Sequence, residues 1–169
     1  MNDSLQGLLD QRRSGQARPA AEPTGGEDPG SDEQSCAAFG YLRGIRDRAL
    51  SIEFRLANGN SRAFPYSWMG VMSYDRSAGV LLQFVGDVIY YVLIEGSNLN
   101  ALVNGGSSLF DRGILRNRIT WIREMTRSQA ERAGPGEVVV DRIRIASYRP
   151  DEEPKGMEWL EPFKLVGEG

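Results

Sequence analysis

The sequence predicts one α+β domain over residues 36–149, with a mainly antiparallel sheet of about five to seven strands and one or two short helices. Three observations favour this class. Apolar and polar residues alternate over residues 50–56, which is the period of a half-buried strand. Short β-branched and aromatic runs follow, and Gly, Asn, Asp or Pro residues separate them. Such frequent turns favour a meander that curls into a barrel-like or half-barrel core.

Residues 1–35 are predicted to form a disordered acidic tail. Residues 10–35 contain many Gly, Pro, Ser and acidic residues and no aromatic residue, and Thr24 is the only β-branched one. Such a segment cannot bury enough apolar surface to offset the entropy that ordering would cost. Order is expected to begin near Phe39. Gly40 and Gly44 argue against a stable helix there, so an entry strand and a short helical turn both fit.

A hairpin is predicted from residue 50 onward. Leu50, Ile52, Phe54 and Leu56 make the apolar face of its first arm. Asn58-Gly59 follows, and this dipeptide between alternating runs favours a tight hairpin turn. The return arm should end near Pro65, because proline cannot donate a hydrogen bond to a strand neighbour.

Three strands are predicted next, over residues 71–74, 80–85 and 88–95. The second and third are apolar on both faces, which is typical of central strands or of strands that a helix covers. Beyond them, residues 98–103 and 107–115 each fit a short helix.

Three elements are predicted for the rest of the domain. Residues 119–122 are β-branched and aromatic, and therefore predict a strand. Thr126 and Gln129 have the spacing of a capping box, which predicts a short helix over residues 127–133. Residues 138–148 predict a final strand.

Formal charge is distributed unevenly along the chain, with a basic central zone between two acidic ends. Residues 1–35 carry a formal charge of −4, residues 36–149 carry +5, and residues 150–169 carry −4, which gives the net charge of −3. The central zone contains fifteen arginines and no lysine. A basic domain between acidic ends is informative about partners, because net charge governs association more than fold.

Arginines cluster in two segments of the central zone, and Trp121 lies in the second. Arginines beside an exposed aromatic ring suit single-stranded nucleic acid, whereas a solvated surface with local ion pairs explains the same residues without a function. The arginine bias itself is also typical of a GC-rich genome. The candidate binding residues are Arg43, Arg46, Arg48, Arg112, Arg116, Arg118, Arg123 and Trp121.

Several catalytic chemistries are excluded within this chain. It has no histidine and a single cysteine, Cys36, so neither a Ser-His-Asp nor a Cys-His nucleophile can form. The chain also lacks the histidine and multiple cysteine ligands that zinc sites usually use, so we expect no metal and no cofactor. A hydrolase that uses two carboxylates stays a third hypothesis, although no spacing selects a pair. The remaining candidates are Glu53, Asp75, Asp87, Glu95, Asp111, Glu124 and Asp141.

The last residues, 150–169, combine an acidic linker with an apolar segment. Trp159, Leu160 and Phe163 stand among acids, as in a linear motif that folds onto a partner or docks back on its own domain. We therefore predict a cytoplasmic, non-enzymatic binding or protein-interaction domain. Its partner is expected to be a protein or a second copy rather than nucleic acid or a membrane, and a nucleic-acid-binding small barrel is the alternative.

Overall fold

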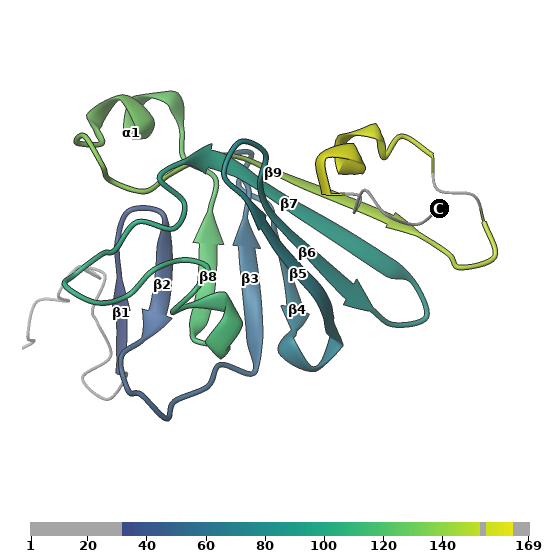
Figure 1. The fold of residues 1–169 in the computed structure, drawn as a ribbon, viewed down its shortest axis with the longest axis horizontal. Coiled ribbons are helices and arrows are strands. Elements are labelled where there is room, and N and C mark those ends of the chain that lie inside the picture. The colour runs from purple at the N-terminus through teal and green to yellow at the C-terminus, as the bar shows by residue number, and fades with distance from the viewer. Residues whose placement is uncertain (1–31, 153–154, 164–169) are drawn as a thin grey trace, which may run out of the picture. The chain divides into compact units, whose positions relative to one another are not determined.

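The structure, a computed structural model, describes residues 32–152 and 155–163. The predicted disorder of residues 1–31 lies outside these residues. The described chain is mainly β and contains nine strands, which form one five-stranded and one four-stranded sheet (Figure 1). The strands are β1 (Glu33–Ser35), β2 (Phe39–Leu42), β3 (Ser51–Arg55), β4 (Ser61–Pro65), β5 (Met69–Asp75), β6 (Gly79–Val85), β7 (Ile89–Ser97), β8 (Ile119–Arg123) and β9 (Val139–Tyr148).

Helical structure is short throughout the described residues. One α-helix, α1 (Arg127–Arg132), follows the predicted capping box, in which the Gln129 backbone nitrogen donates to the Thr126 side chain and the Thr126 backbone nitrogen donates to the Gln129 side chain. The 3₁₀ segments are η2 (Tyr66–Trp68), η3 (Ile114–Arg116) and η4 (Glu158–Phe163). Residues 98–103 contain no helix, and Asn98 and Asn104, at the start of the segment and just beyond its end, adopt positive φ angles of 54° and 48° outside the right-handed helical region.

The five-stranded sheet has the order β1-β2-β8-β3-β4. The predicted Asn-Gly hairpin is confirmed: β3 and β4 pair antiparallel, and Gly59 takes a φ of 87° in the turn. Strand β8 comes from much later in the chain and inserts between β2 and β3. It pairs parallel to β3, so this sheet is mixed.

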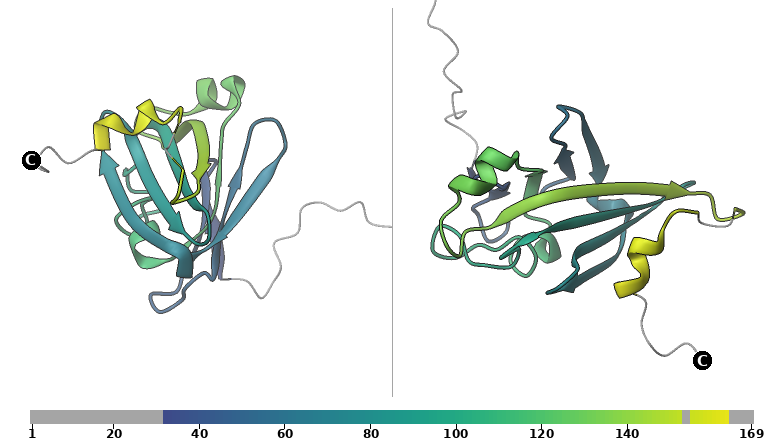
Figure 2. Two further views of the ribbon diagram at one scale, coloured as in Figure 1. Left: turned by 90° about the vertical axis from the view of Figure 1, so that its right-hand side faces the viewer. Right: turned by 90° about the horizontal axis from the view of Figure 1, so that it is seen from above.

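The four-stranded sheet has the order β5-β6-β7-β9 and is antiparallel throughout. The first three of its strands form the predicted meander. Strands β6 and β7 are central, as their apolar character on both faces predicts. Figure 2 shows η4 on the face of this sheet that is turned away from the five-stranded sheet.

The two sheets share one apolar core. Phe54 and Phe64 of the five-stranded sheet meet Phe84 of the four-stranded sheet, with ring centroids 6.1 Å and 4.5 Å from that of Phe84. All three rings are buried. Tyr66 extends this core, and its hydroxyl donates a hydrogen bond to the backbone oxygen of Ile119 at 2.8 Å.

The prediction of a single curled sheet of five to seven strands is therefore wrong. Two open sheets pack on each other, and neither closes into a barrel. The short 3₁₀ turn η2 directs the chain from β4 of one sheet into β5 of the other, a change of sheet that local periodicity cannot reveal. Strand β1 was also missed. Its three polar residues, assigned above to the tail, pair antiparallel with β2, and the Tyr41 hydroxyl of β2 also donates to Oε1 of Gln34 at 3.1 Å.

A β-bulge interrupts the alternation of faces along β9. Glu95 pairs with Arg142 and Gly96 pairs with Val140, so the register shifts by one residue on the β9 side. Val140 and Ile143 consequently both point into the core, although strict alternation places them on opposite faces.

Candidate functional site

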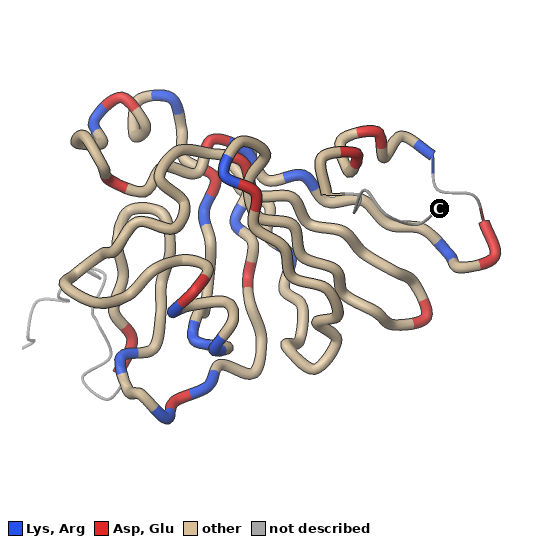
Figure 3. The backbone as a smooth tube through the Cα atoms, viewed as in Figure 1, with Lys and Arg blue, Asp and Glu red and all other residues tan. Residues whose placement is uncertain are grey.

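Two arginine-bearing segments lie side by side at one end of the five-stranded sheet, and we call residues 43–50 and 114–118 together the basic end. The backbone nitrogen of Leu42 donates to the oxygen of Arg118 at 2.8 Å, and that of Ala49 donates to the oxygen of Asn117 at 2.7 Å. Figure 3 shows the basic residues along the loop between β2 and β3. Residues about seventy positions apart in the sequence thus form one surface.

Local chemistry holds the basic end together. The guanidinium of Arg118 donates from Nε to the backbone oxygen of Leu42 at 2.9 Å and from Nη2 to that of Arg43 at 2.8 Å. Asn117 ends η3 with a φ of 51°, a left-handed conformation that asparagine adopts more readily than most residues. This turn directs the chain from η3 into β8, with Leu115 and Arg116 of η3 exposed and Ile114 buried in the core.

Positive charge at the basic end is largely uncompensated. Five arginines stand against Asp47 within these two segments and against the neighbouring Asp32, whose backbone oxygen accepts from the Arg43 nitrogen, which leaves a formal charge of +3. In the described part of the chain the ion pairs use Arg55, Arg127 and Arg144 instead. The arginines of the basic end are Arg43, Arg46, Arg48, Arg116 and Arg118.

Aliphatic side chains are exposed among these arginines. Ile45 is 83% exposed, Leu50 is 89% exposed and Leu115 is 46% exposed. Single exposed aliphatic residues are ordinary, but three on two joined segments beside unpaired arginines are typical of an interaction surface. The basic end contains no aromatic residue.

Trp121 lies apart from the basic end, half-buried on the outer face of the five-stranded sheet. Its indole nitrogen donates to Oε1 of Glu33 at 3.0 Å. The guanidinium carbons of Arg55 and Arg123 lie 4.6 Å and 5.5 Å from its ring centroid. The indole packs directly against Gly40, because a side chain there would overlap it.

The surroundings of Trp121 are close to neutral. Arg55 forms an ion pair with Glu53 at 2.8 Å, and Arg123 donates to the backbone oxygen of Ala37. Burial alone would raise the pKa of Glu53, but hydrogen bonds from Ser61 and Arg55 outweigh it and lower that pKa. Arginines that already have these partners are less available to a phosphate backbone.

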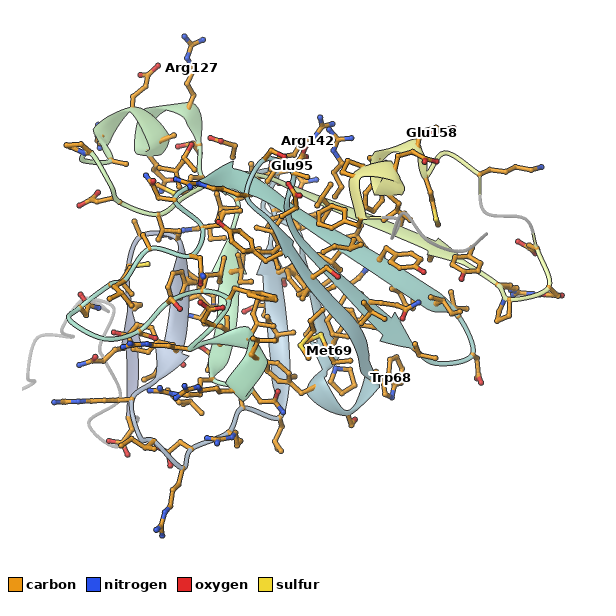
Figure 4. All side chains as sticks on the ribbon, in the orientation of Figure 1. Trp68, Met69, Glu95, Arg127, Arg142 and Glu158 are labelled. Carbon is orange, nitrogen blue, oxygen red and sulfur yellow. The ribbon has the colours of Figure 1, made fainter. Side chains whose placement is uncertain are left out.

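The predicted second arginine cluster is consequently divided. Arg116 and Arg118 lie at the basic end, whereas Arg123 lies at the other end of β8, which at about 3.3 Å per residue carries the chain away. Arg112 lies in the preceding loop, and its guanidinium donates to the backbone oxygen of Gly106 at 2.8 Å. Arg127 extends from α1, away from both sheets (Figure 4).

Several candidate carboxylates have structural partners. Glu95 is held by Arg144 in a two-bonded ion pair, with Nε to Oε2 at 2.8 Å. Asp111 accepts a hydrogen bond from Asn100 at 2.7 Å. Asp75 accepts from the backbone nitrogens of Ser77 and Ala78, as expected of aspartate in a turn. The described residues bring no group of three or more Cys, Asp or Glu side chains into a metal-binding arrangement.

Asp75 gives a pH-dependent prediction. Hydrogen bonds from the Ser77 side chain, then from the Ser77 and Ala78 backbone, lower the pKa of Asp75 below its ordinary value of 3.8. A lowered pKa in the folded state stabilises the fold above pH 3.8, and this contribution is lost as the pH falls through the folded-state pKa. Urea unfolding should therefore show wild type more stable than Asp75→Asn at neutral pH. A difference in unfolding free energy between wild type and Asp75→Asn that does not narrow at acidic pH would contradict this assignment.

The C-terminal segment lies on the outer face of the four-stranded sheet, and we call residues 157–163 the C-terminal cover. Met157 is buried, while Leu160 and Phe163 line a cavity of about 520 Å³ together with Leu81 and Tyr91 of the sheet. The predicted partner motif therefore packs on its own domain, at the four-stranded sheet rather than at the basic end. The sheet face explains why: Leu81 and Leu93 point outward there, yet are only 6% and 2% exposed.

Comparisons with known proteins identify no relative. No protein family, no curated protein and no solved structure matches this chain. The described segments also contain no helix long and apolar enough to span a bilayer. Function is consequently argued from the surfaces of the chain itself.

The sequence interpretation missed three features of these surfaces. Leu50 was assigned to the apolar face of β3, but the strand begins at Ser51 and Leu50 is exposed. Ile45 lies beside Arg46 and between Arg43 and Arg48 in the sequence, and a lone aliphatic residue among charged ones indicates an exposed position. Arg55 was not selected, although the alternation along β3 places it on the polar face beside Trp121.

Proposed function

We propose that this chain is a non-enzymatic protein-interaction domain that binds an acidic segment of a partner protein at the basic end. One observation carries the proposal. The side chains of Arg43, Arg46 and Arg116 are exposed and have no hydrogen bond or ion pair within the described residues, and they stand beside exposed Ile45, Leu50 and Leu115.

The chemistry of this surface defines the partner. Guanidinium groups bind carboxylates in a two-bonded geometry and attract them over a distance. The aliphatic side chains contribute buried apolar area once water is excluded. A segment that carries both Asp or Glu and apolar side chains satisfies both requirements.

Nucleic acid is the less favoured partner. Binding of single strands relies on aromatic rings that stack on bases, and the basic end has none. Trp121, the aromatic residue of the second arginine cluster, lies instead beside Glu33 and Glu53 on the sheet face. Arginines alone would bind a phosphate backbone without the stacking contribution.

Charge reversal at the basic end tests the proposal. The triple variant Arg43→Glu, Arg46→Glu, Arg116→Glu changes side chains without a partner in the described structure, so it should fold. The matched control is Arg76→Glu, Arg132→Glu, Arg149→Glu, which changes three exposed arginines elsewhere. Binding is measured by fluorescence anisotropy with a labelled peptide of Glu and Leu, and with single-stranded RNA of equal charge.

We expect wild type and the control to bind the acidic peptide, with affinity that falls as salt rises. The triple variant should bind at least about tenfold more weakly, because several charge pairs of order 1 kcal/mol become repulsive. Equal peptide binding by both variants would contradict the proposal. Tighter binding of the RNA than of the peptide would favour the nucleic-acid alternative.

A further inference from the structure

The cavity under the C-terminal cover has the size and lining of a small-molecule site. Its volume of about 520 Å³ lies within the range of about 300–1,000 Å³ that ligand pockets occupy. The floor is the outer face of β5, β6, β7 and β9, and the cover forms the roof. The lining includes Val71, Leu81, Tyr91, Tyr148, Leu160 and Phe163.

Polar groups converge at one side of this apolar lining. The Tyr91 and Tyr148 rings are parallel, at an interplanar angle of 11° with centroids 6.0 Å apart. Gln83 donates from Nε2 to the Tyr91 hydroxyl at 2.9 Å, which fixes the position of that ring. Burial, followed by the neighbouring Tyr91 hydroxyl, raises the pKa of Tyr148, so its hydroxyl stays protonated near neutral pH.

Acidic side chains line this cavity. Glu158 and Glu161 do so from η4, and the described residues of the lining include no lysine or arginine. Figure 4 shows Glu158 on η4, above the four-stranded sheet. Aromatic faces attract cations through their quadrupole, and a carboxylate at the rim adds to that attraction. An anionic ligand would meet the like charge of Glu158 here.

We propose that this cavity binds a small amphipathic cation, with its apolar body between the cover and the sheet and its cationic head near Tyr91, Tyr148 and Glu158. This site is separate from the basic end and does not depend on the partner proposed there.

Calorimetric titration of the full chain with hexyltrimethylammonium tests the proposal, and hexanoate and hexanol serve as anionic and neutral probes. The cation should bind at least about tenfold more tightly than hexanoate, since only the cation gains from the rings and the carboxylate. Two variants localise the binding. Ser73→Trp fills the cavity from its floor and should abolish binding. Glu158→Gln should weaken binding of the cation about three- to tenfold, as loss of one partly exposed charge pair implies.

The control is Glu131→Gln, which removes an exposed acid of α1 and should leave the affinity unchanged. Circular dichroism checks that each variant folds. Binding of hexanoate or hexanol as tight as that of the cation would overturn the assignment of charge. Undiminished binding in a folded Ser73→Trp variant would overturn the assignment of the cavity.

Discussion

Phe84→Ala lowers the free energy of unfolding by about 3–5 kcal/mol, the cost typical of truncating a fully buried phenylalanine. Phe84 has no exposed surface, and it is the ring of the four-stranded sheet that meets Phe54 and Phe64 of the five-stranded sheet. Truncation leaves a cavity between the two sheets that neither can fill without moving.

The measurement is urea unfolding followed by tryptophan fluorescence, with Phe84→Leu as the conservative control. Leucine keeps most of the volume, so its cost should be about 1–1.5 kcal/mol. If Phe84→Ala cost less than about 1 kcal/mol, the close packing described for the two sheets would be wrong, because even modest core truncations exceed that cost.

Gly79→Ala has the second large effect, a loss of about 2–5 kcal/mol, from left-handed backbone strain combined with overpacking. Gly79 begins β6 with a φ of 119°, and a side chain there would overlap the backbone oxygen of Ile94 on β7. The neighbour is a backbone group in a paired strand, so it cannot rotate away.

Gly59→Ala is the matched control for this substitution. Gly59 also has a positive φ, 87°, but open space surrounds the position of an added side chain. The Gly59→Ala variant should therefore lower the free energy of unfolding only by the cost of the left-handed backbone conformation, about 1 kcal/mol. Thermal unfolding of the two variants separates the cost of backbone strain from the cost of steric overlap. Equal losses of stability in the two variants would contradict the close approach of β6 and β7.

The hairpin, the meander and the capped helix could all be predicted because their signals are local. Asn58-Gly59 fixes a turn through its own backbone preferences, and Thr126 with Gln129 fixes the start of α1 in the same way. The apolar faces of β6 and β7 likewise predicted strands covered on both sides. These features depend on residues that are close together in the sequence.

The arrangement of the sheets and the site could not be predicted, because both depend on distant pairings. Strand β8 pairs with β2 and β3, which are far from it in the sequence. Nothing in residues 119–123 indicates that these two strands are its neighbours. The same pairing brings Arg116 beside the loop that carries Arg46, and it moves Arg123 away from both. Clusters along the sequence therefore group Arg123 with arginines that lie elsewhere in the fold. They also do not show that Arg116 and Arg46 lie on the same surface.

Chemical-shift mapping tests the proposed interaction at the basic end most directly. Isotope-labelled full chain is titrated with the peptide of Glu and Leu, and backbone amide resonances are followed. The account predicts the largest shifts in residues 43–50 and 114–118, and their loss in the triple arginine-to-glutamate variant. Shifts concentrated on the outer face of β8 around Trp121, or unchanged shifts in that variant, would contradict it.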